Sequence, residues 1–179
     1  MSAPGGPVTP GAPVTPDAFR AAVQGMAAGV AVVSTALRGL QHAITATSFT
    51  WVSVEPPLLL VCVHQDARFL DAVEETGTWG LSLLTSGQRA AAAWLATPGR
   101  PAVGQLAQVP HGPGPVTGVP LLTGALAAFE CRTTAAHPGG DHVIVVGEVV
   151  SIGGQPQSPA GDAPDDPLVR FRGSYRRLA

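Results

Sequence analysis

Residues 125–152, ALAAFECRTTAAHPGGDHVIVVGEVVSI, contain two long stretches of apolar and β-branched residues on either side of a Pro-Gly-Gly turn. Runs of this composition, bounded by turn residues, are typical of β-strands. The pattern predicts two paired strands at 125–136 and 141–152, joined by the turn HPGG.

Shorter segments before and after this pair have the same character. Strands are predicted at 30–37, 41–54, 58–64, 79–84 and 168–175, with a hairpin turn at Arg38-Gly39 and a stop at Pro56-Pro57. Helices are predicted from residue 16, and over 68–76 and 86–96. The first is signalled by Thr15 as N-cap and Pro16 at its first position, and Gly29 ends it. Its apolar face would hold Phe19, Val23 and Met26.

Most of the chain is therefore predicted to be β-structure, with a few short helices. Because strands and helices do not alternate regularly, a doubly wound parallel sheet is not expected. A small closed or split barrel is the economical arrangement, since closure removes exposed strand edges. Residues 1–15 are rich in Pro, Gly and Thr and predict a disordered arm, with residues 16–179 as one domain. Segments 98–120 and 153–167 are expected to be irregular.

The composition also indicates which classes of partner to expect. Hydrophobic residues make up 45% of the chain and charged residues 12%, so much of the surface must be apolar, which predicts a homodimer. The net charge of −2, without a basic cluster, argues against nucleic acid. No apolar run reaches the ~20 residues of a membrane span and no signal peptide is evident, so a cytoplasmic location and no membrane contact are expected.

The sequence contains few side chains in patterns that could catalyse a reaction without a cofactor. The chain has no lysine, no P-loop, and no GxSxG, HExxH or strand-linked GxGxxG motif. The five histidines are scattered, and His137 and His142 lack a further ligand at useful spacing, so no metal site is predicted. Cys62 and Cys131 form no CxxC motif, which leaves buried free thiols and a disulfide both open. A bound cofactor would have to supply the reactivity of an enzyme.

Hydroxyl side chains gather in the segment ITATSFTWVSVEPP, residues 44–57. They could simply alternate with apolar residues along a half-exposed strand. They could also line the edge of a flat ligand, because small hydroxyls and free amides bond ring nitrogens and carbonyls without covering the ring faces.

A set of motifs that occur in order resembles the flavin reductase family. They are GVAVVST, TATSFTWVSVEPPLLLVCV, WGLSLL, GVPLLTGALAAFEC, GGDHVIVVGEV and PLVRFRGSYRRL, and together they cover about residues 17–178. The resemblance implies a mostly β fold, a six-stranded split β-barrel (the FMN-binding split barrel, of Greek-key type) with a few short flanking helices. It also implies a homodimer that takes FMN or FAD, with NADH or NADPH as co-substrate.

The resemblance also implies roles for individual residues of the flavin site. Residues 45–49 would follow the isoalloxazine edge, and Ser53 would lie beside the ribityl chain. The pyrimidine-to-phosphate side would be lined by residues 63–65, and Arg68, at a helix start, would meet the phosphate. The residues implied to bind flavin are thus Thr45, Ala46, Thr47, Ser48, Phe49, Ser53, Val63, His64, Gln65 and Arg68.

The Gly-Asp-His turn and the last strand complete the implied site. His142 would be the catalytic residue that helps to hold the nicotinamide over the flavin, and Asp141 would fix its turn. Tyr175 would border the pocket or pack in the core. The implied reaction is hydride transfer from NADH or NADPH to flavin N5, which feeds a partner monooxygenase. The alternative is a protein that keeps its flavin as an electron carrier, or as prosthetic group for a small organic substrate, without efficient NAD(P)H oxidation.

Some residues depart from the family pattern. Ala67 and Phe69 stand where phosphate-binding hydroxyls are common, and Asp66 adds a negative charge beside them. Phosphate binding could therefore be weaker, or taken over by Arg100. Trp51 replaces a small polar residue, and it could stack on a ring or restrict which ligand enters.

Overall fold

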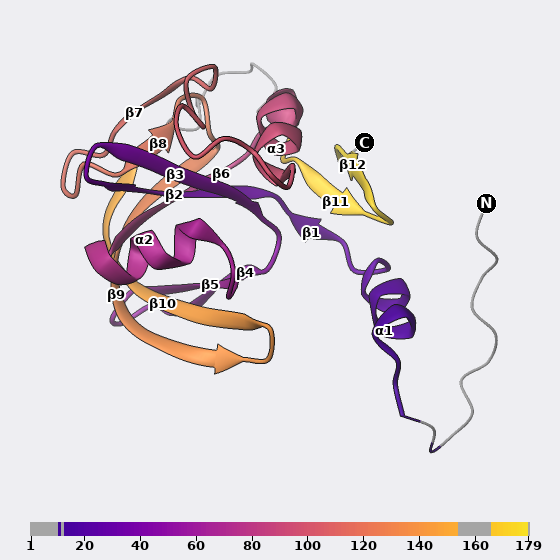
Figure 1. Cartoon of the computed structure of the whole chain (residues 1–179). Helices are drawn as coiled ribbons and strands as arrows, with labels where there is room; N and C mark the ends of the chain where they lie inside the picture. The colour runs from indigo at the N-terminus through magenta and orange to yellow at the C-terminus, as the bar shows by residue number, and fades with distance from the viewer. Residues whose placement is uncertain (1–10, 12, 154–165, 179) are drawn as a thin grey trace.

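A seven-stranded antiparallel sheet forms the body of the protein in a computed structural model that describes residues 11, 13–153 and 166–178 (Figure 1). The strand order is β3-β2-β6-β9-β10-β5-β4. The strands are β2 (Ala31–Leu37), β3 (Leu40–Ala46), β4 (Phe49–Ser53), β5 (Leu58–His64), β6 (Thr78–Leu83), β9 (Ala127–Gly139) and β10 (His142–Gly153). The mostly β prediction is confirmed. Most of the predicted arm at 1–15 and most of the predicted loop at 153–167 lie outside the described residues.

The seventh strand arises because the predicted strand 41–54 is broken. β3 ends at Ala46 and β4 begins at Phe49, so Thr47 and Ser48 connect the two opposite ends of the sheet. The carbonyl of Ser48 accepts a hydrogen bond of 2.8 Å from the amide of Cys62, which fixes the bend against β5. The hydroxyl-rich segment is therefore a corner between two strands rather than one continuous strand.

The long β9–β10 hairpin turns later than predicted. β9 continues to Gly139, which pairs with His142, so the turn consists of Gly140 and Asp141 instead of HPGG. Gly140 has a φ of +76°, a conformation that glycine adopts without steric cost. Two bulges, at 146/147 and between 149 and 151, interrupt the pairing and increase its twist.

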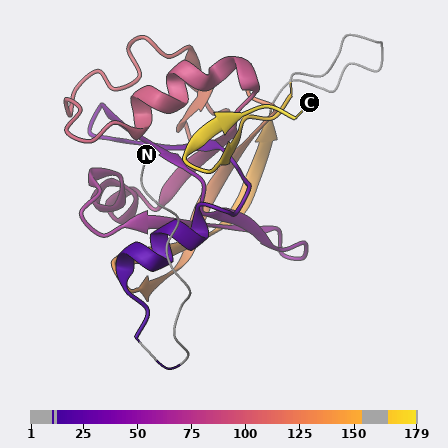
Figure 2. The ribbon, with the colours of Figure 1, turned by 90° about the vertical axis from the view of Figure 1, so that its right-hand side faces the viewer.

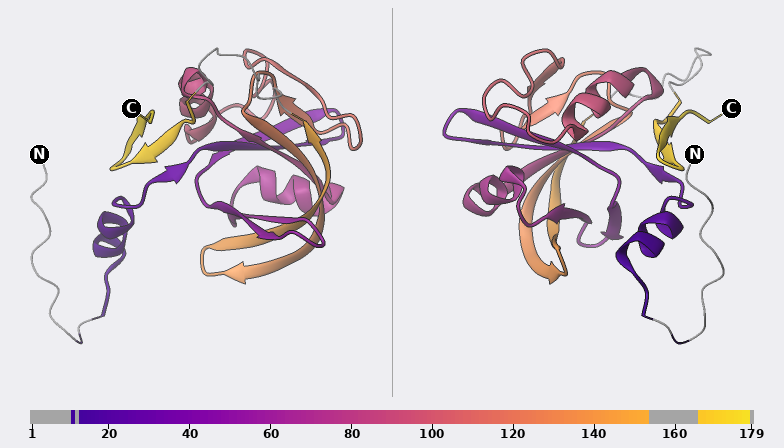
Figure 3. Two further views of the ribbon diagram at one scale, coloured as in Figure 1. Left: turned by 180° about the vertical axis from the view of Figure 1, so that it is seen from behind. Right: turned by 45° about the vertical axis from the view of Figure 1, so that its right-hand side comes forward.

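Two helices cover opposite sides of the β2–β3 hairpin (Figure 3). α2 (Arg68–Thr76) has the predicted bounds, buries Phe69, Leu70 and Val73, and ends at Gly77 with φ +66°. The predicted helix 86–96 divides into a 3₁₀ turn, η1 (Ser86–Gln88), and α3 (Arg89–Ala96).

The N-terminal helix α1 (Pro16–Val23) stands away from the sheet (Figure 1) and lies in front of it in the view of Figure 2. The hydroxyl of Thr15 accepts a hydrogen bond of 3.2 Å from the amide of Ala18, so the predicted cap is confirmed. The helix ends well before the expected Gly29, and none of its residues is buried.

Small elements account for the rest of the described chain. The predicted strand 168–175 is wrong, because the chain reverses at Arg172-Gly173, where both residues have positive φ. The result is a hairpin of β11 (Val169–Phe171) and β12 (Ser174–Arg176), with β11 also pairing to β1 (Ala28–Gly29). The segment 98–120 is largely irregular, as expected, and only β7 (His111–Pro113) and β8 (Pro120–Leu122) form in or beside it.

Two apolar clusters fill the two sides of the β2–β3 hairpin. One lies under α2 and is centred on Trp79, Phe69 and Leu81; the other lies under α3 and includes Leu95. Burying side chains of this size stabilises a fold by roughly 1.5–3 kcal/mol each, relative to leaving them exposed. Cys62 and Cys131 are both free thiols, so no disulfide joins them. None of the described helices has the length and apolar character needed to cross a membrane.

Candidate functional site

The corner at Thr47-Ser48 forms one wall of a cavity of about 630 Å³. The end of β3, the end of β5, the first residue of β10 and the C-terminal end of α3 provide the other walls. The polar groups at its lining are Thr45, Thr47, Ser48, Cys62, His64, Asp66, Thr97, Arg100 and His142. Segments far apart in sequence therefore bring hydroxyls, imidazoles and a guanidinium to one place.

The β3 wall is held in position by a bond to α3. The hydroxyl of Thr45 donates a hydrogen bond of 2.7 Å to the carbonyl of Ala92, which ties the strand to the helix. Ala46 is nearly buried at the lining, whereas Phe49 packs against the apolar cluster under α2 and does not line the cavity. Within the predicted range 45–49, the free side-chain donors at the cavity are thus those of Thr47 and Ser48.

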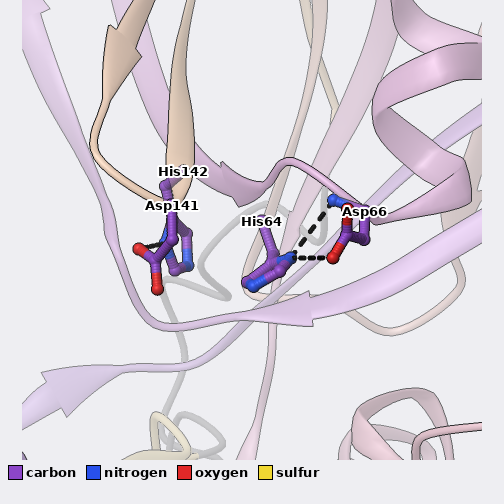
Figure 4. Close-up of polar contacts among 4 residues, drawn as sticks. All are labelled: His64, Asp66, Asp141 and His142. Carbon is purple, nitrogen blue, oxygen red and sulfur yellow. Dashed lines mark hydrogen bonds and ion pairs between the residues drawn. The ribbon is translucent and has the colours of Figure 1, made fainter.

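Two histidines face each other across the β5–β10 pair (Figure 4). His142 is the direct partner of His64 in the strand register, and the centroids of their rings lie 5.2 Å apart with the planes at 74°. Both side chains are close to half exposed. The predicted catalytic histidine therefore has a second imidazole as its immediate neighbour.

Each of these histidines is bonded through Nδ1, but in opposite senses. Nδ1 of His142 lies 2.7 Å from a carboxylate oxygen of Asp141, so it donates. Nδ1 of His64 lies 3.2 Å from the amide of Asp66, so it accepts. The carboxylate beside Nδ1 of His142 fixes the proton there, which leaves Nε2 as the acceptor of the neutral imidazole, whereas Nδ1 of His64 lies near both the amide and, at 3.8 Å, the carboxylate of Asp66. The hydrogen bond from His142 holds the pKa of the Asp141 carboxyl below its usual range.

Neighbouring residues of β5 point away from the cavity or tie its rim. Val63 is buried in the cluster under α2, on the opposite face of the strand from Cys62 and His64. The amide of Gln65 donates a hydrogen bond of 3.0 Å to the carbonyl of Asp141, so the end of β5 is joined to the β9–β10 turn.

Ser53 and Tyr175 lie outside this cavity. Ser53 ends β4, where it pairs with Leu58. Tyr175 lies on β12 and packs against the apolar cluster under α3, and the guanidinium carbon of Arg170 lies 5.3 Å from the centre of its ring. The structure thus places Tyr175 in packing, one of the two roles that the sequence left open.

A smaller, cationic cavity of about 230 Å³ adjoins the first and shares part of its lining. Arg68 begins α2 at its rim, as predicted, and its Nη2 donates a hydrogen bond of 2.6 Å to the carbonyl of Arg100. Arg100 donates from Nη2 to the carbonyl of Ala43 at 2.9 Å and from Nη1 to that of Thr97 at 2.6 Å. His42 completes this wall. Burial lowers the pKa of Arg100, and the nearby charge of Arg68 lowers it further.

Sequence reasoning missed part of the lining. Cys62 could have been found, because strand alternation places residues 62 and 64 on one face. His42 and the end of α3 carried no signal of their own, since only the folded chain brings them together. A larger cavity of about 760 Å³ beside the first turns of α3 has no titratable side chain at its lining, so it offers less chemistry. Among the described residues, no three His, Cys, Asp or Glu side chains converge as metal ligands.

Comparison with known proteins agrees with this geometry. Residues 23–179 match the family described as flavin reductase like domain. The reductase component of 4-hydroxyphenylacetate 3-monooxygenase from Thermus thermophilus is 37% identical over 90% of this chain and 96% of its own length. Flavin reductase (NADH) from Kitasatospora aureofaciens is 36% identical over 90% and 81%. The NADH:FAD oxidoreductase SgcE6 of Streptomyces globisporus C-1027, solved with NAD and FAD fragments, superposes with a TM-score of 0.81 at 32% identity over 91% and 92%.

Proposed function

The chain belongs to the family of flavin reductase-like domains, and we propose that it is an oxidoreductase that uses NADH to reduce FMN or FAD. The observation that carries the proposal is the 630 Å³ cavity, where the Thr47-Ser48 corner faces the His64–His142 pair. The cavity volume lies within the range of about 300–1,000 Å³ that is usual for small-molecule sites.

The lining residues fit a flavin for chemical reasons. When bound, flavin supplies the chemistry, because its ring system accepts a hydride from a nicotinamide. The chain supplies binding and alignment: Thr47 and Ser48 offer small donors at the ring edge, and apolar residues such as Ile44 and Leu95 alternate with the other polar groups of the lining. His142, oriented by Asp141, would hold the nicotinamide against the flavin through its free Nε2.

The reduced flavin is proposed to serve a partner monooxygenase. The Thermus thermophilus relative is named as the reductase component of such an enzyme. The alternative, a carrier that retains its flavin without oxidising NADH, is not favoured, because the relatives are named as reductases. A cavity open at its rim and half-exposed histidines also suit exchange of flavin with solvent or with a partner.

A homodimer is also part of the proposal. It is supported by the large apolar side chains exposed in the single chain, among them Phe19 (60%), Met26 (69%) and Trp51 (70%). Soluble monomers rarely expose many such groups. Light scattering coupled to gel filtration should give twice the chain mass, and a monomer would contradict this part of the proposal. A cytoplasmic location is proposed as well, and the two free thiols suit a reducing compartment.

The test of the function is direct. Purified protein is mixed anaerobically with NADH and either FMN or FAD, while the nicotinamide band and the flavin band are followed together. We expect both bands to fall in parallel, faster with NADH than with NADPH. Bound flavin without NADH oxidation would support the carrier instead, and no oxidation with either flavin would contradict the reductase.

A further inference from the structure

The contact between His64 and His142 is fixed by the strands that carry them. The amide of Gln65 donates a hydrogen bond of 3.0 Å to the carbonyl of Asp141, which makes residues 64 and 142 a non-hydrogen-bonded pair of the antiparallel ladder. Opposing side chains come closest at such pairs, where the Cα atoms are about 4.5 Å apart. The two imidazoles therefore remain neighbours for as long as the ends of β5 and β10 stay paired.

The two rings meet edge to face. Their centroids lie 5.2 Å apart and their planes make an angle of 74°. Flat rings prefer this arrangement to a face-to-face stack, because the edge of one ring is positive and the face of the other is negative. Each ring thus limits the rotation of the other.

His64 has a support of its own on the side away from His142. The amide of Asp66 donates to Nδ1 of His64 at 3.2 Å, and a carboxylate oxygen of Asp66 lies 3.8 Å from the same nitrogen. Figure 4 shows the four side chains in a row, with Asp66 and Asp141 at its ends and the two imidazoles between them. Each imidazole is therefore held by an aspartate on its outer side and by the other ring on its inner side.

The bond from His142 to Asp141 is a weak restraint when it acts alone. The Asp141 side chain is 74% exposed and that of His142 is 41% exposed. Water competes for an exposed contact between such groups, so it contributes little to holding them in one geometry. A ring held at one nitrogen can also pivot about that bond. The contact with His64 restricts the pivot, because it acts on the plane of the ring.

We propose that His64 is a positioning residue for His142, a role that rests on the proposed function. It would hold the His142 imidazole in the orientation in which Nε2 meets the nicotinamide. His64 lies on the cavity face of β5, as Cys62 does, and from there its ring reaches His142 across the strand pair. His64 is thereby assigned to the nicotinamide side of the site, whereas the family resemblance implies a place along the flavin.

The first test separates the effect on NADH from the effect on flavin. Steady-state kinetics give kcat/KM for NADH, and quenching of flavin fluorescence gives the dissociation constant of FMN. We expect His64→Gln to lower kcat/KM about threefold to tenfold, the loss that one ring contact would give. The dissociation constant of FMN should change less than about twofold, because His64 acts through His142. A loss confined to FMN binding would overturn the proposal and return His64 to the flavin.

His137→Gln is the matched control for this substitution. His137 is an exposed histidine on the neighbouring strand β9, and it does not line the cavity. Neither kcat/KM for NADH nor the dissociation constant of FMN should change in this variant. A loss equal to that of His64→Gln would show a general sensitivity of the sheet and overturn the specific role.

His64→Phe distinguishes the ring contact from the bond to Asp66. Phenylalanine keeps a flat ring at the same strand position, but it cannot accept a hydrogen bond from the amide of Asp66. We expect kcat/KM for NADH to recover to within about twofold of the unmodified protein. If His64→Phe is as impaired as His64→Gln, the ring contact is not what holds His142, and the proposal fails.

A double-mutant cycle tests whether His64 acts through His142. In a protein that already carries His142→Gln, the further change His64→Gln should lower kcat/KM less than about 1.5-fold, because the residue that it positions is gone. Losses that multiply independently would mean that His64 contacts a ligand directly, and they would overturn the positioning role.

Nuclear magnetic resonance gives a readout that needs no turnover. Ring protons of His64 and His142 should show a nuclear Overhauser contact in the unmodified protein, and the His142 ring signals should move toward those of a freely rotating imidazole in His64→Gln. Absence of the contact, or His142 signals that stay in place, would overturn the proposal. Both effects without any NADH oxidation would instead overturn the proposed function and leave the paired rings standing.

Discussion

Two clusters of charged side chains in this protein differ in whether the chain itself satisfies their charge. The carboxylate of Glu130 is fully buried, and the amides of Val116 and Thr117 and the hydroxyl of Thr117 all donate to it. Arg68 and Arg100 both line a smaller cavity, where the guanidinium of Arg68 donates to the carbonyl of Arg100, and among the described residues no carboxylate is paired with either guanidinium. The buried charge is satisfied by the chain itself, whereas the two charges at the cavity rim are not paired with any carboxylate of the described residues.

The Glu130 cluster also holds the irregular segment 98–120 to the sheet. Burial alone would raise the pKa of the Glu130 carboxyl, but the bonds from Thr117, Val116 and Ser151 outweigh it, and the pKa is lowered. Gly114 lies against the same carboxylate so closely that a Cβ there would collide with it. The anion is therefore a fixed anchor, which the neighbouring backbone is shaped to fit.

Removing the buried charge of Glu130 should have the largest effect on the free energy of unfolding. Glu130→Gln keeps the volume but turns an NH₂ group toward donors, so we expect the free energy of unfolding to fall by about 3 kcal/mol. Urea denaturation measures the change. Glu148→Gln, on an exposed site of β10, is the control and should cost less than about 0.5 kcal/mol. Equal costs for the two variants would show that the buried bonds contribute little.

In the Asp141–His142 pair the chain satisfies only one of the two imidazole nitrogens. Nδ1 of His142 is bonded to Asp141, whereas Nε2 is bonded to none of the described residues. His142→Gln should lower kcat/KM for NADH about tenfold to hundredfold, as expected when a reactant is misaligned. The dissociation constant of FMN should stay within about threefold. His137→Gln, at an exposed histidine of the same hairpin, should change neither quantity. A loss confined to FMN binding would assign His142 to the flavin instead of the nicotinamide.

Arg68→Gln, unlike Glu130→Gln, should have almost no effect on the stability of the fold. The side chain is exposed, and the loss of its bond to the Arg100 carbonyl is offset by relief of the repulsion between two guanidiniums. We expect the free energy of unfolding to change by less than about 0.5 kcal/mol, measured in urea without phosphate. A loss near that of Glu130→Gln would mean that this cluster too maintains the fold.

Local patterns predicted the elements but not the places where they meet. The spacing of Phe69, Leu70 and Val73 is a property of nine consecutive residues, and so the α2 face was predictable. The break at Thr47-Ser48 depends on pairing with β5 at Cys62, which local propensity does not contain. His42 and Arg100 are distant in sequence, and no motif indicates that a turn after α3 would fold back onto β3.

The smallest predicted effect is on the pH dependence of stability, because His42 and Glu130 should act in different pH ranges. The folded pKa of His42 lies below its unfolded value of about 6.5, so the unfolded chain binds more protons as the pH falls below that value. Stability should therefore decline below about pH 6.5, and His42→Gln should remove this part of the decline. Glu130, whose folded pKa is also lowered, loses its contribution only on further acidification, below the unfolded value of about 4.3.

Urea denaturation at about pH 7.5 and 5.5 in His42→Gln and in the unmodified protein distinguishes the two. An identical decline in both proteins would place its origin at groups other than His42, whereas a smaller decline in His42→Gln would assign the difference to this partly buried imidazole.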